Sequence, residues 1–199
     1  MALVNKPNLA SSHSNLGVMY KVQGNLPEAK KSFLEAIRID PENAVSWSNL
    51  GGVFKDQGDI KSAIDYYKEA IRLEPRFADA YSNLGSCLKE AGMVEDAKRA
   101  FETAIELRPD FALAHSNMGT IYFDQGNIAK AVKSFKLAIQ LESNFPDAYV
   151  FFFSFSILSI HSPLPNTLAF PQQTGTTISE TRFELRTSST KQSRAFEWH

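Results

Sequence analysis

The sequence predicts an all-α fold, a solenoid built from repeated pairs of helices. Asn-Leu-Gly occurs at 15–17, 49–51 and 83–85, and Asn-Met-Gly occurs at 117–119, so the motif returns every 34 residues. This period is that of a unit of two antiparallel helices. Such a unit cannot bury its own apolar face and becomes stable by stacking on copies of itself. We therefore expect four stacked units within a solenoid that extends over about three quarters of the 199 residues.

The first helix of each unit is indicated by apolar residues at helical spacing. The Leu or Met of the motif and the large apolar residue four positions later share one face of a helix, so we expect both in the core. The later positions are Tyr20, Phe54, Leu88 and Tyr122. A glycine then follows each first helix, where a left-handed conformation ends a helix at low cost. These glycines are Gly24, Gly58, Gly92 and Gly126.

The second helix of each unit is indicated by small residues, rings and prolines. Residues that recur at the same position of successive units are called a column below. Two columns of small residues predict that the second helix approaches the first closely. They are the motif glycines 17, 51, 85 and 119 on the first helix and Ala29, Ala63, Ala97 and Ala131 on the second. Two further columns are predicted to fill the groove between the helices and the next turn: Phe33, Tyr67, Phe101 and Phe135, then Ala36, Ala70, Ala104 and Ala138. Prolines end the second helices, because proline lacks the donor that a continuing helix needs. They are Pro41, Pro75 and Pro109.

This set of columns resembles the tetratricopeptide repeat. The resemblance implies a right-handed superhelix of four full helix-turn-helix repeats, at residues 10–43, 44–77, 78–111 and 112–145. Ala2, Leu3 and Pro7 correspond to Ala36, Ile37 and Pro41 one repeat later, so residues 1–9 are interpreted as the end of a preceding repeat. The chain is therefore expected to begin inside an array.

The pattern stops after residue 149. Residues 146–160 are interpreted as an aborted fifth repeat or a capping helix, because Phe151, Phe152 and Phe153 stand where the motif is due. If this segment does not cap the last repeat, it is an exposed apolar stretch that favours aggregation. Its apolar run is about 12 residues long, whereas a spanning helix needs about 20. Residues 161–199 are rich in Ser, Thr and Pro without periodicity, and we expect a disordered tail there.

Composition restricts the class of partner and the compartment. The formal net charge is −1, which is not the basic footprint of a nucleic-acid-binding protein. The single cysteine, Cys87, can form no internal disulfide, and no Asn-x-Ser/Thr glycosylation motif occurs. A reducing, intracellular setting is expected, in the cytoplasm or the nucleus. Neither a signal peptide nor a membrane segment is indicated.

No catalytic, cofactor-binding or metal-binding residue is predicted. His13 and His115 share a column with Trp47, Tyr81 and Tyr149, which indicates an aromatic packing position that tolerates histidine. Cys87 lies on an apolar helix face without a cationic neighbour, as a buried small residue would. Gly51-Gly52 precedes no Gly-Lys-Ser/Thr, so no phosphate-binding loop is indicated.

The asparagines of the motif lack a packing explanation. Asparagine is a poor helix former, and one stands inside every predicted first helix. Stacked first helices line the concave surface of the array, so the amides would form a ladder with one rung per repeat. An amide both donates and accepts hydrogen bonds, which suits the backbone of an extended peptide. Alternatively, each amide braces its own repeat or the next. The candidate peptide-binding residues are Asn15, Asn49, Asn83 and Asn117.

One family carries such an asparagine ladder. The segments at 67–73, 77–85 and 126–132 closely resemble the superhelical repeats of O-linked N-acetylglucosamine transferases, plant members above all. In that family the ladder recruits protein substrates for a domain that transfers N-acetylglucosamine from its uridine diphosphate carrier to Ser or Thr. Only the ladder residues carry over, because 50 unrelated residues stand where the catalytic domain should follow. The resemblance thus implies a fragment or truncated product, not an enzyme by itself, that binds extended Ser/Thr-containing segments.

Three other functions are open to a helical repeat array of this kind. A co-chaperone clamp for acidic C-termini needs Lys and Arg on the concave positions, but serines precede the asparagines, and only Lys21, Lys55 and Lys89 form a partial basic row. A base-reading RNA-binding array would need a basic groove. A general scaffold or adaptor without any link to glycosylation remains an alternative. Exposed apolar ends of the array could also drive self-association.

Overall fold

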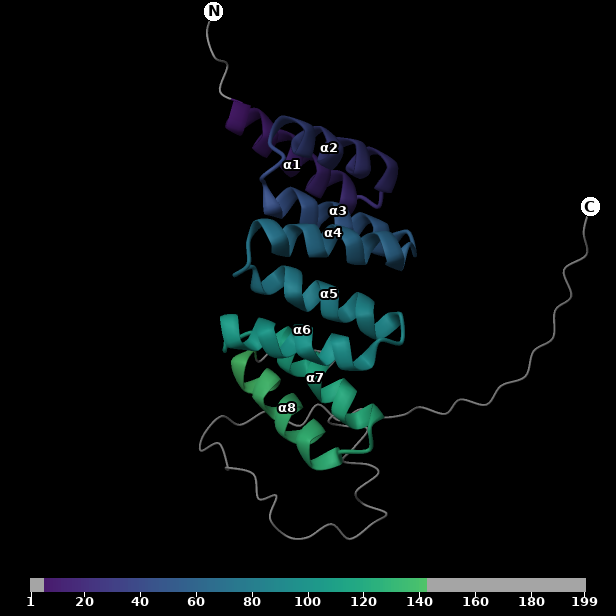
Figure 1. Ribbon diagram of the computed structural model, residues 1–199, viewed down its shortest axis with the longest axis vertical. Coiled ribbons are helices and arrows are strands. Elements are labelled where there is room, and N and C mark those ends of the chain that lie inside the picture. Colours follow the sequence, from purple (N-terminus) through teal and green to yellow (C-terminus); the bar gives the residue numbers. More distant parts are fainter. Residues whose placement is uncertain (1–5, 143–199) are drawn as a thin grey trace, which may run out of the picture. The chain divides into compact units, whose positions relative to one another are not determined.

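The computed structural model describes residues 6–142, with side chains from Leu9 onward, and this part of the chain is helical throughout apart from short turns (Figure 1). Its eight helices are α1 (Lys6–Val22), α2 (Leu26–Ile39), α3 (Ala44–Asp56), α4 (Ile60–Leu73), α5 (Ala78–Glu90), α6 (Val94–Leu107), α7 (Ala112–Asp124) and α8 (Ile128–Leu141). The all-α prediction is confirmed. The predicted capping helix at 146–160 and the predicted disordered tail at 161–199 lie outside the described residues, as do residues 1–5.

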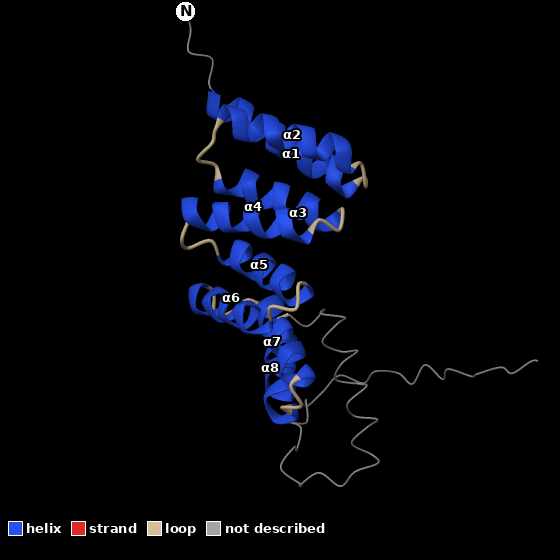
Figure 2. Cartoon of the chain, turned by 45° about the vertical axis from the view of Figure 1, so that its right-hand side comes forward, coloured by secondary structure: helices blue, strands red, loops and turns tan. Residues whose placement is uncertain are grey.

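The helices are paired into hairpins that follow one another along the stack. Each odd-numbered helix packs on the even-numbered helix that follows it, and the second helix of one pair packs on the first helix of the next (Figure 2). In addition, α1 contacts α3, α3 contacts α5, and α5 contacts α7. The first helices therefore form a continuous row, as predicted for helices that line the inner face of a solenoid.

The turn inside each hairpin depends on one glycine. Gly24, Gly58, Gly92 and Gly126 have φ values between 73° and 78°. This is the left-handed region that glycine enters without penalty. The residue after the glycine donates its backbone N–H across the helix end, for example from Asp59 to the carbonyl of Phe54 at 2.9 Å. That bond identifies a Schellman turn and satisfies a carbonyl that the helix end leaves free. The predicted glycine C-caps are thus confirmed.

The motif glycines make room for a ring of the second helix. A Cβ atom built on Gly85 would lie 2.8 Å from Cε1 of Phe101, and the other three motif glycines face Phe33, Tyr67 and Phe135 in the same way. The rings of Phe33 and Phe101 are fully buried. The predicted close approach of the two helices at these glycines is confirmed, but the nearest atoms belong to the aromatic ring of the second helix and not to the predicted alanine.

The N-terminal end differs from the repeat register. By that register the first helix should begin at Ala10, which corresponds to Ala44, but α1 begins at Lys6. Residues 6–9 are therefore the first turn of α1. The interpretation of residues 1–9 as the end of a preceding repeat stays a prediction. Pro7 lies where a helix needs no backbone donor, so this proline is compatible with a helix start. Pro41, Pro75 and Pro109 do follow second helices, as predicted.

An aromatic cluster joins the first two hairpins. The rings of Phe54 and Tyr66 stack with their centroids 4.8 Å apart, and Trp47 packs on Tyr66 at 5.7 Å. The Nζ atom of Lys30 lies 4.3 Å from the centroid of Phe54. Helices α2, α3 and α4 thus meet in one stacked group. Within residues 6–142, none of the helices is long and apolar enough to cross a bilayer.

Candidate peptide-binding face

The four candidate asparagines lie at one register of the first helices α1, α3, α5 and α7. On each helix the residue before the asparagine is a buried serine. In α3, α5 and α7 the residue after it is a buried Leu or Met, whereas Leu16 of α1 is exposed. Asn15 is exposed, and Asn49, Asn83 and Asn117 are partly exposed. The row of first helices therefore carries one accessible amide per repeat.

The four amides make no hydrogen bond to other groups of residues 6–142. The side chains of Asn25, Asn43 and Asn127, by contrast, each accept a backbone N–H at a helix start. The bonds expected if the motif amides brace the stack are therefore missing from the described part of the chain. An amide left without an internal partner keeps its donors and its acceptor for water or a ligand.

The positions one turn away complete the face around the amides. Ser86 and Thr120, three residues after an asparagine, donate their hydroxyls to the carbonyls of Ser82 and Ser116 at 3.2 Å. Four residues before each asparagine stand Ser11, Val45, Asp79 and Leu113. These offsets place all three columns on the same side of the helix. The face is thus a mixture of small polar and apolar groups around the amides.

The basic row near the ends of the first helices is engaged in ion pairs. Nζ of Lys21 lies 3.4 Å from a carboxylate oxygen of Asp56, and Nζ of Lys89 lies 3.8 Å from one of Asp124. Each pair joins a first helix to the first helix of the next repeat. These lysines are partly exposed, so the pairs add little stability. They do lower the positive charge that an acidic ligand would need.

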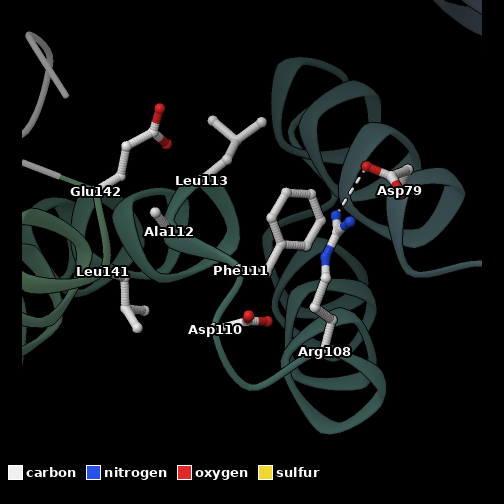
Figure 3. A pocket seen from close by; sticks show the side chains of 8 residues that line it. All are labelled: Asp79, Arg108, Asp110, Phe111, Ala112, Leu113, Leu141 and Glu142. Carbon is white, nitrogen blue, oxygen red and sulfur yellow. Dashed lines mark hydrogen bonds and ion pairs between the residues drawn. The ribbon is translucent and has the colours of Figure 1, made fainter. Parts of the chain in front are cut away.

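A depression of about 330 Å³ opens beside this face between the last two hairpins (Figure 3). Arg108 contacts two residues there, Asp79 and Phe111. Its Nη2 atom donates to a carboxylate oxygen of Asp79 at 2.8 Å, and its guanidinium carbon lies 3.5 Å from the ring centroid of Phe111. Asp79 and Leu113, which also line the depression, are the residues one turn before Asn83 and Asn117. The depression therefore adjoins the amide row.

Two of the residues considered for catalysis, His115 and Cys87, have structural surroundings. Nε2 of His115 lies 2.9 Å from the carbonyl oxygen of Pro109, and Trp47, in the same column, donates Nε1–H to the carbonyl of Pro41 at 2.8 Å. The shared contact ties the helix start to the preceding turn, a role that the aromatic character of the column did not reveal. Cys87 is buried, and burial raises the pKa of its thiol. Among the described residues no His/Cys/Asp/Glu cluster is arranged to hold a metal ion.

Family models and solved structures agree on the repeat. Three models, each described as a tetratricopeptide repeat, match residues 8–74, 54–119 and 112–145. No curated protein matches the chain in sequence. MamA is 31% identical with a TM-score of 0.61, and the match covers 69% of this chain and 80% of MamA. YrrB, described as a TPR protein with an unusual peptide-binding site, is 29% identical with a TM-score of 0.59, covering 70% of this chain and 72% of YrrB.

An O-GlcNAc transferase from Thermobaculum terrenum is also similar, at 23% identity and a TM-score of 0.58, over 61% of this chain and 23% of that one. At that identity the likeness concerns the fold alone. Structures of several differently named proteins are thus similar to this one. The family models together span residues 8–145, and the chain belongs to the tetratricopeptide-repeat family of protein-interaction scaffolds.

Proposed function

We propose that the row of first helices holds an extended protein segment through the amides of Asn15, Asn49, Asn83 and Asn117. The observation that supports this is the accessible amide in every repeat, without a hydrogen-bond partner in residues 6–142. A buried or braced polar group would need no ligand, whereas these groups are available to one. YrrB, a repeat protein of similar structure, is described as having a peptide-binding site.

The spacing of the helices suits an extended chain. Helices in contact lie about 8–10 Å apart, and an extended peptide advances about 3.3 Å per residue. One amide therefore meets the peptide at about every third residue, where it can accept a backbone N–H and donate to a carbonyl. The amides thus bind the backbone of the peptide. The residue columns beside the amides contact the peptide's side chains, and these contacts add specificity.

The proposed ligands are Ser/Thr-containing segments, as in the substrate-recruiting repeats of O-linked N-acetylglucosamine transferases. The recurring Asn-Leu-Gly or Asn-Met-Gly and the segment at 77–85 support this origin through their resemblance to that family. In this proposal the chain recruits and does not transfer the sugar. Incubation with labelled UDP-N-acetylglucosamine and a Ser/Thr-rich peptide should give no transfer by this chain alone. Labelled product would contradict the recruiting role without catalysis.

A general scaffold is the alternative function, and the similarity to MamA and YrrB favours it. The two functions differ in what they require of the ligand. We would compare a Ser/Thr-rich peptide with the same peptide in which Ala replaces Ser and Thr. Preference for the first supports the transferase-like function, and equal binding supports the general scaffold. The ion pairs of Lys21 and Lys89 disfavour a clamp for acidic C-termini.

The amide row is tested by the double substitution Asn49→Ala and Asn83→Ala. Loss of two amides, each with two hydrogen bonds to the peptide, should weaken binding ten-fold or more in a calorimetric titration, at about 0.5–1.5 kcal/mol for each hydrogen bond. The free protein should become slightly more stable, because Ala is the better helix former. A matched control removes the exposed amides of Gln23 and Gln57, which lie at the helix ends outside the row. Unchanged affinity in the Asn49/Asn83 variant would refute the proposal.

A further inference from the structure

A hollow of about 320 Å³ opens where α4, α5 and α6 meet, in the middle of the described stack. We call it the α5 hollow. Its apolar lining consists of Tyr81, Leu84 and Leu88 of α5 and Met93 and Ala100 at α6. The three α5 residues recur at helical spacing and share one face of that helix, whereas Asn83 is offset from them. The α5 hollow is therefore a separate surface from the amide row.

The contact between the first two hairpins shows what fills this place in another repeat. Three lining residues, Tyr81, Leu88 and Ala100, correspond to Trp47, Phe54 and Tyr66, which stand 34 residues earlier. The ring of Tyr66 stacks on that of Phe54, with the centroids 4.8 Å apart, and its centroid lies 5.7 Å from that of Trp47. In the earlier repeat an aromatic ring of the second helix thus packs on two rings of the first helix.

The α5 hollow lacks this ring because Ala100 ends at its Cβ atom. Ala100 is 7% exposed and Leu88 is 5% exposed, so both side chains lie at the floor. Met93 is 46% exposed, so the hollow is accessible from solvent. Tyr81 still supplies an aromatic wall where Trp47 stands in the earlier repeat. An apolar cavity of about 150 Å³ is enough to admit benzene, so the volume of the α5 hollow is sufficient for a ring.

The contact between the last two hairpins is less suited to an apolar ring. There Tyr122 takes the place of Leu88, and the Nζ atoms of Lys98 and Lys130 lie 6.0 Å and 5.4 Å from its ring centroid. In the middle of the stack, Leu88 shares an apolar cluster with Ile64, which corresponds to Lys98. The surroundings of the α5 hollow therefore favour an uncharged aromatic group.

We propose that the α5 hollow binds the aromatic side chain of a tyrosine or phenylalanine in a partner protein. The ring takes the place that Tyr66 fills in the earlier repeat and packs on Tyr81 and Leu88. The thioether of Met93 adds a favourable contact between sulfur and the ring. A protein segment is the source of the ring, because Lys68 and Thr103 also line the hollow and can bond the backbone on either side of the aromatic residue.

The test titrates N-acetyltyrosinamide, a tyrosine side chain between two peptide groups, into the full chain with isotope-labelled methionine methyl groups. An aromatic ring shifts the magnetic resonance of a methyl group on which it packs. We expect the Met93 signal to move saturably, with a dissociation constant in the millimolar range. Met19, which is 60% exposed on α1, is the internal control, and its signal should stay in place.

Two substitutions should remove the site while keeping the Met93 reporter. Ala100→Tyr fills the α5 hollow from within and should weaken binding about ten-fold or more. The matched control, Ser134→Tyr, places the same ring at the corresponding position of α8 and should leave the Met93 shift unchanged. Circular dichroism checks that the variants fold. Tyr81→Ser removes the aromatic wall at a partly exposed position and should weaken binding about three- to ten-fold, so the inference stays testable if Ala100→Tyr does not fold.

Four results would overturn this inference. They are no Met93 shift at about 50 mM probe, an equal shift in the Ala100→Tyr chain, a Met19 shift as large as that of Met93, and binding of free p-cresol without binding of N-acetyltyrosinamide. The last result would make a small aromatic molecule the ligand instead of a protein side chain. The Asn49→Ala and Asn83→Ala variant should bind the probe unchanged, so failure of the amide row and failure of the α5 hollow are distinguishable.

Discussion

At the scale of single residues, the four repeats allow the same position to be compared in four surroundings. Ser46 shares a column with Ser12, Ala80 and Ala114. Ser46 is fully buried, and its hydroxyl has no hydrogen-bond partner within the described chain. Ala80 and Ala114 are equally buried without any polar group to satisfy. The comparison of Ser46 with Ala80 and Ala114 indicates that this buried position needs a small side chain and no hydroxyl.

Ser46→Ala should therefore stabilise the protein, because an unsatisfied buried hydroxyl costs about 1–3 kcal/mol. The measurement is the free energy of urea unfolding. The reverse change, Ala80→Ser, places a hydroxyl at the same register of α5 and should lower stability by a similar amount. A lower stability of Ser46→Ala would contradict this explanation and indicate a bond or bound water at Ser46.

Two helical glycines should respond oppositely to alanine. In Gly85→Ala the new methyl group would lie 2.8 Å from the buried ring of Phe101, so the ring or the helix must shift, at about 1–3 kcal/mol. In Gly52→Ala the nearest atom, at 2.7 Å, is Nζ of Lys21, the end of a flexible side chain. That variant should be neutral or more stable, because Ala is the better helix former by about 1 kcal/mol. Thermal melting compares the two, and equal melting temperatures would contradict the steric argument.

At the scale of helices, the start of each second helix is set by its N-cap. The side chains of Asn25, Asp59 and Asn127 accept a backbone N–H in the first turn of α2, α4 and α8. The corresponding residue of α6 is Met93, which makes no such bond. Each described hairpin has a first and a second helix. Among the second helices, α6 is thus the one that begins without a side-chain cap.

Met93→Asn should stabilise the protein by about 0.5–2 kcal/mol, since it supplies the missing acceptor. Met93 is also 46% exposed, so little apolar burial is lost. The free energy of unfolding in urea measures the gain. The reciprocal change, Asn127→Met, should cost a similar amount at α8. If Met93→Asn were destabilising, the packing of Met93 would outweigh the cap.

The cap of α4 should give a pH dependence. The hydroxyl and backbone N–H of Ser62 donate to Asp59 and lower the pKa of its carboxyl below the usual 3.8. A lowered folded-state pKa contributes stability above pH 3.8 that is lost as the pH falls through the folded-state value. Asp59→Asn keeps the acceptor without the charge, so its melting temperature should fall less between pH 5 and pH 2 than that of the parent chain. An identical fall in both would exclude this role.

The helices could be predicted from the sequence because their signals are local. A glycine after the first helix and a proline after the second, such as Gly58 and Pro75, end a helix whatever surrounds them. The start of α1 at Lys6 was not predicted, because a helix start depends on capping groups rather than on repeat register. The amide row could be predicted at Asn49 and its equivalents, and its peptide binding stays a prediction. Exposed apolar ends of the array were expected, but the columns did not identify Met19 as an exposed residue, because its burial depends on a neighbouring helix.

At the scale of the whole stack, the main contacts in the described chain join neighbouring hairpins, through consecutive helices and through the first helices of successive repeats. Stability is then nearly a sum of repeat and interface terms, and the ends can unfold separately. Gly119→Val, which crowds Phe135 in the last described hairpin, should raise amide exchange in α7 and α8 and leave α3 to α5 protected. Gly85→Val in the middle should raise exchange on both sides. Uniform exchange in both variants would indicate one cooperative unit.

The fluorescence of Trp47 can report on the aromatic cluster around this residue. The indole packs on Tyr66 of the same hairpin and donates to the carbonyl of Pro41 in the preceding turn, so its emission is sensitive to the folding of the second hairpin. Trp198, the other tryptophan, lies outside the described residues, and Trp198→Phe would remove its signal. The remaining fluorescence would then follow the unfolding of α3 and α4 in stopped-flow experiments, independently of the hairpins nearer the C-terminal end.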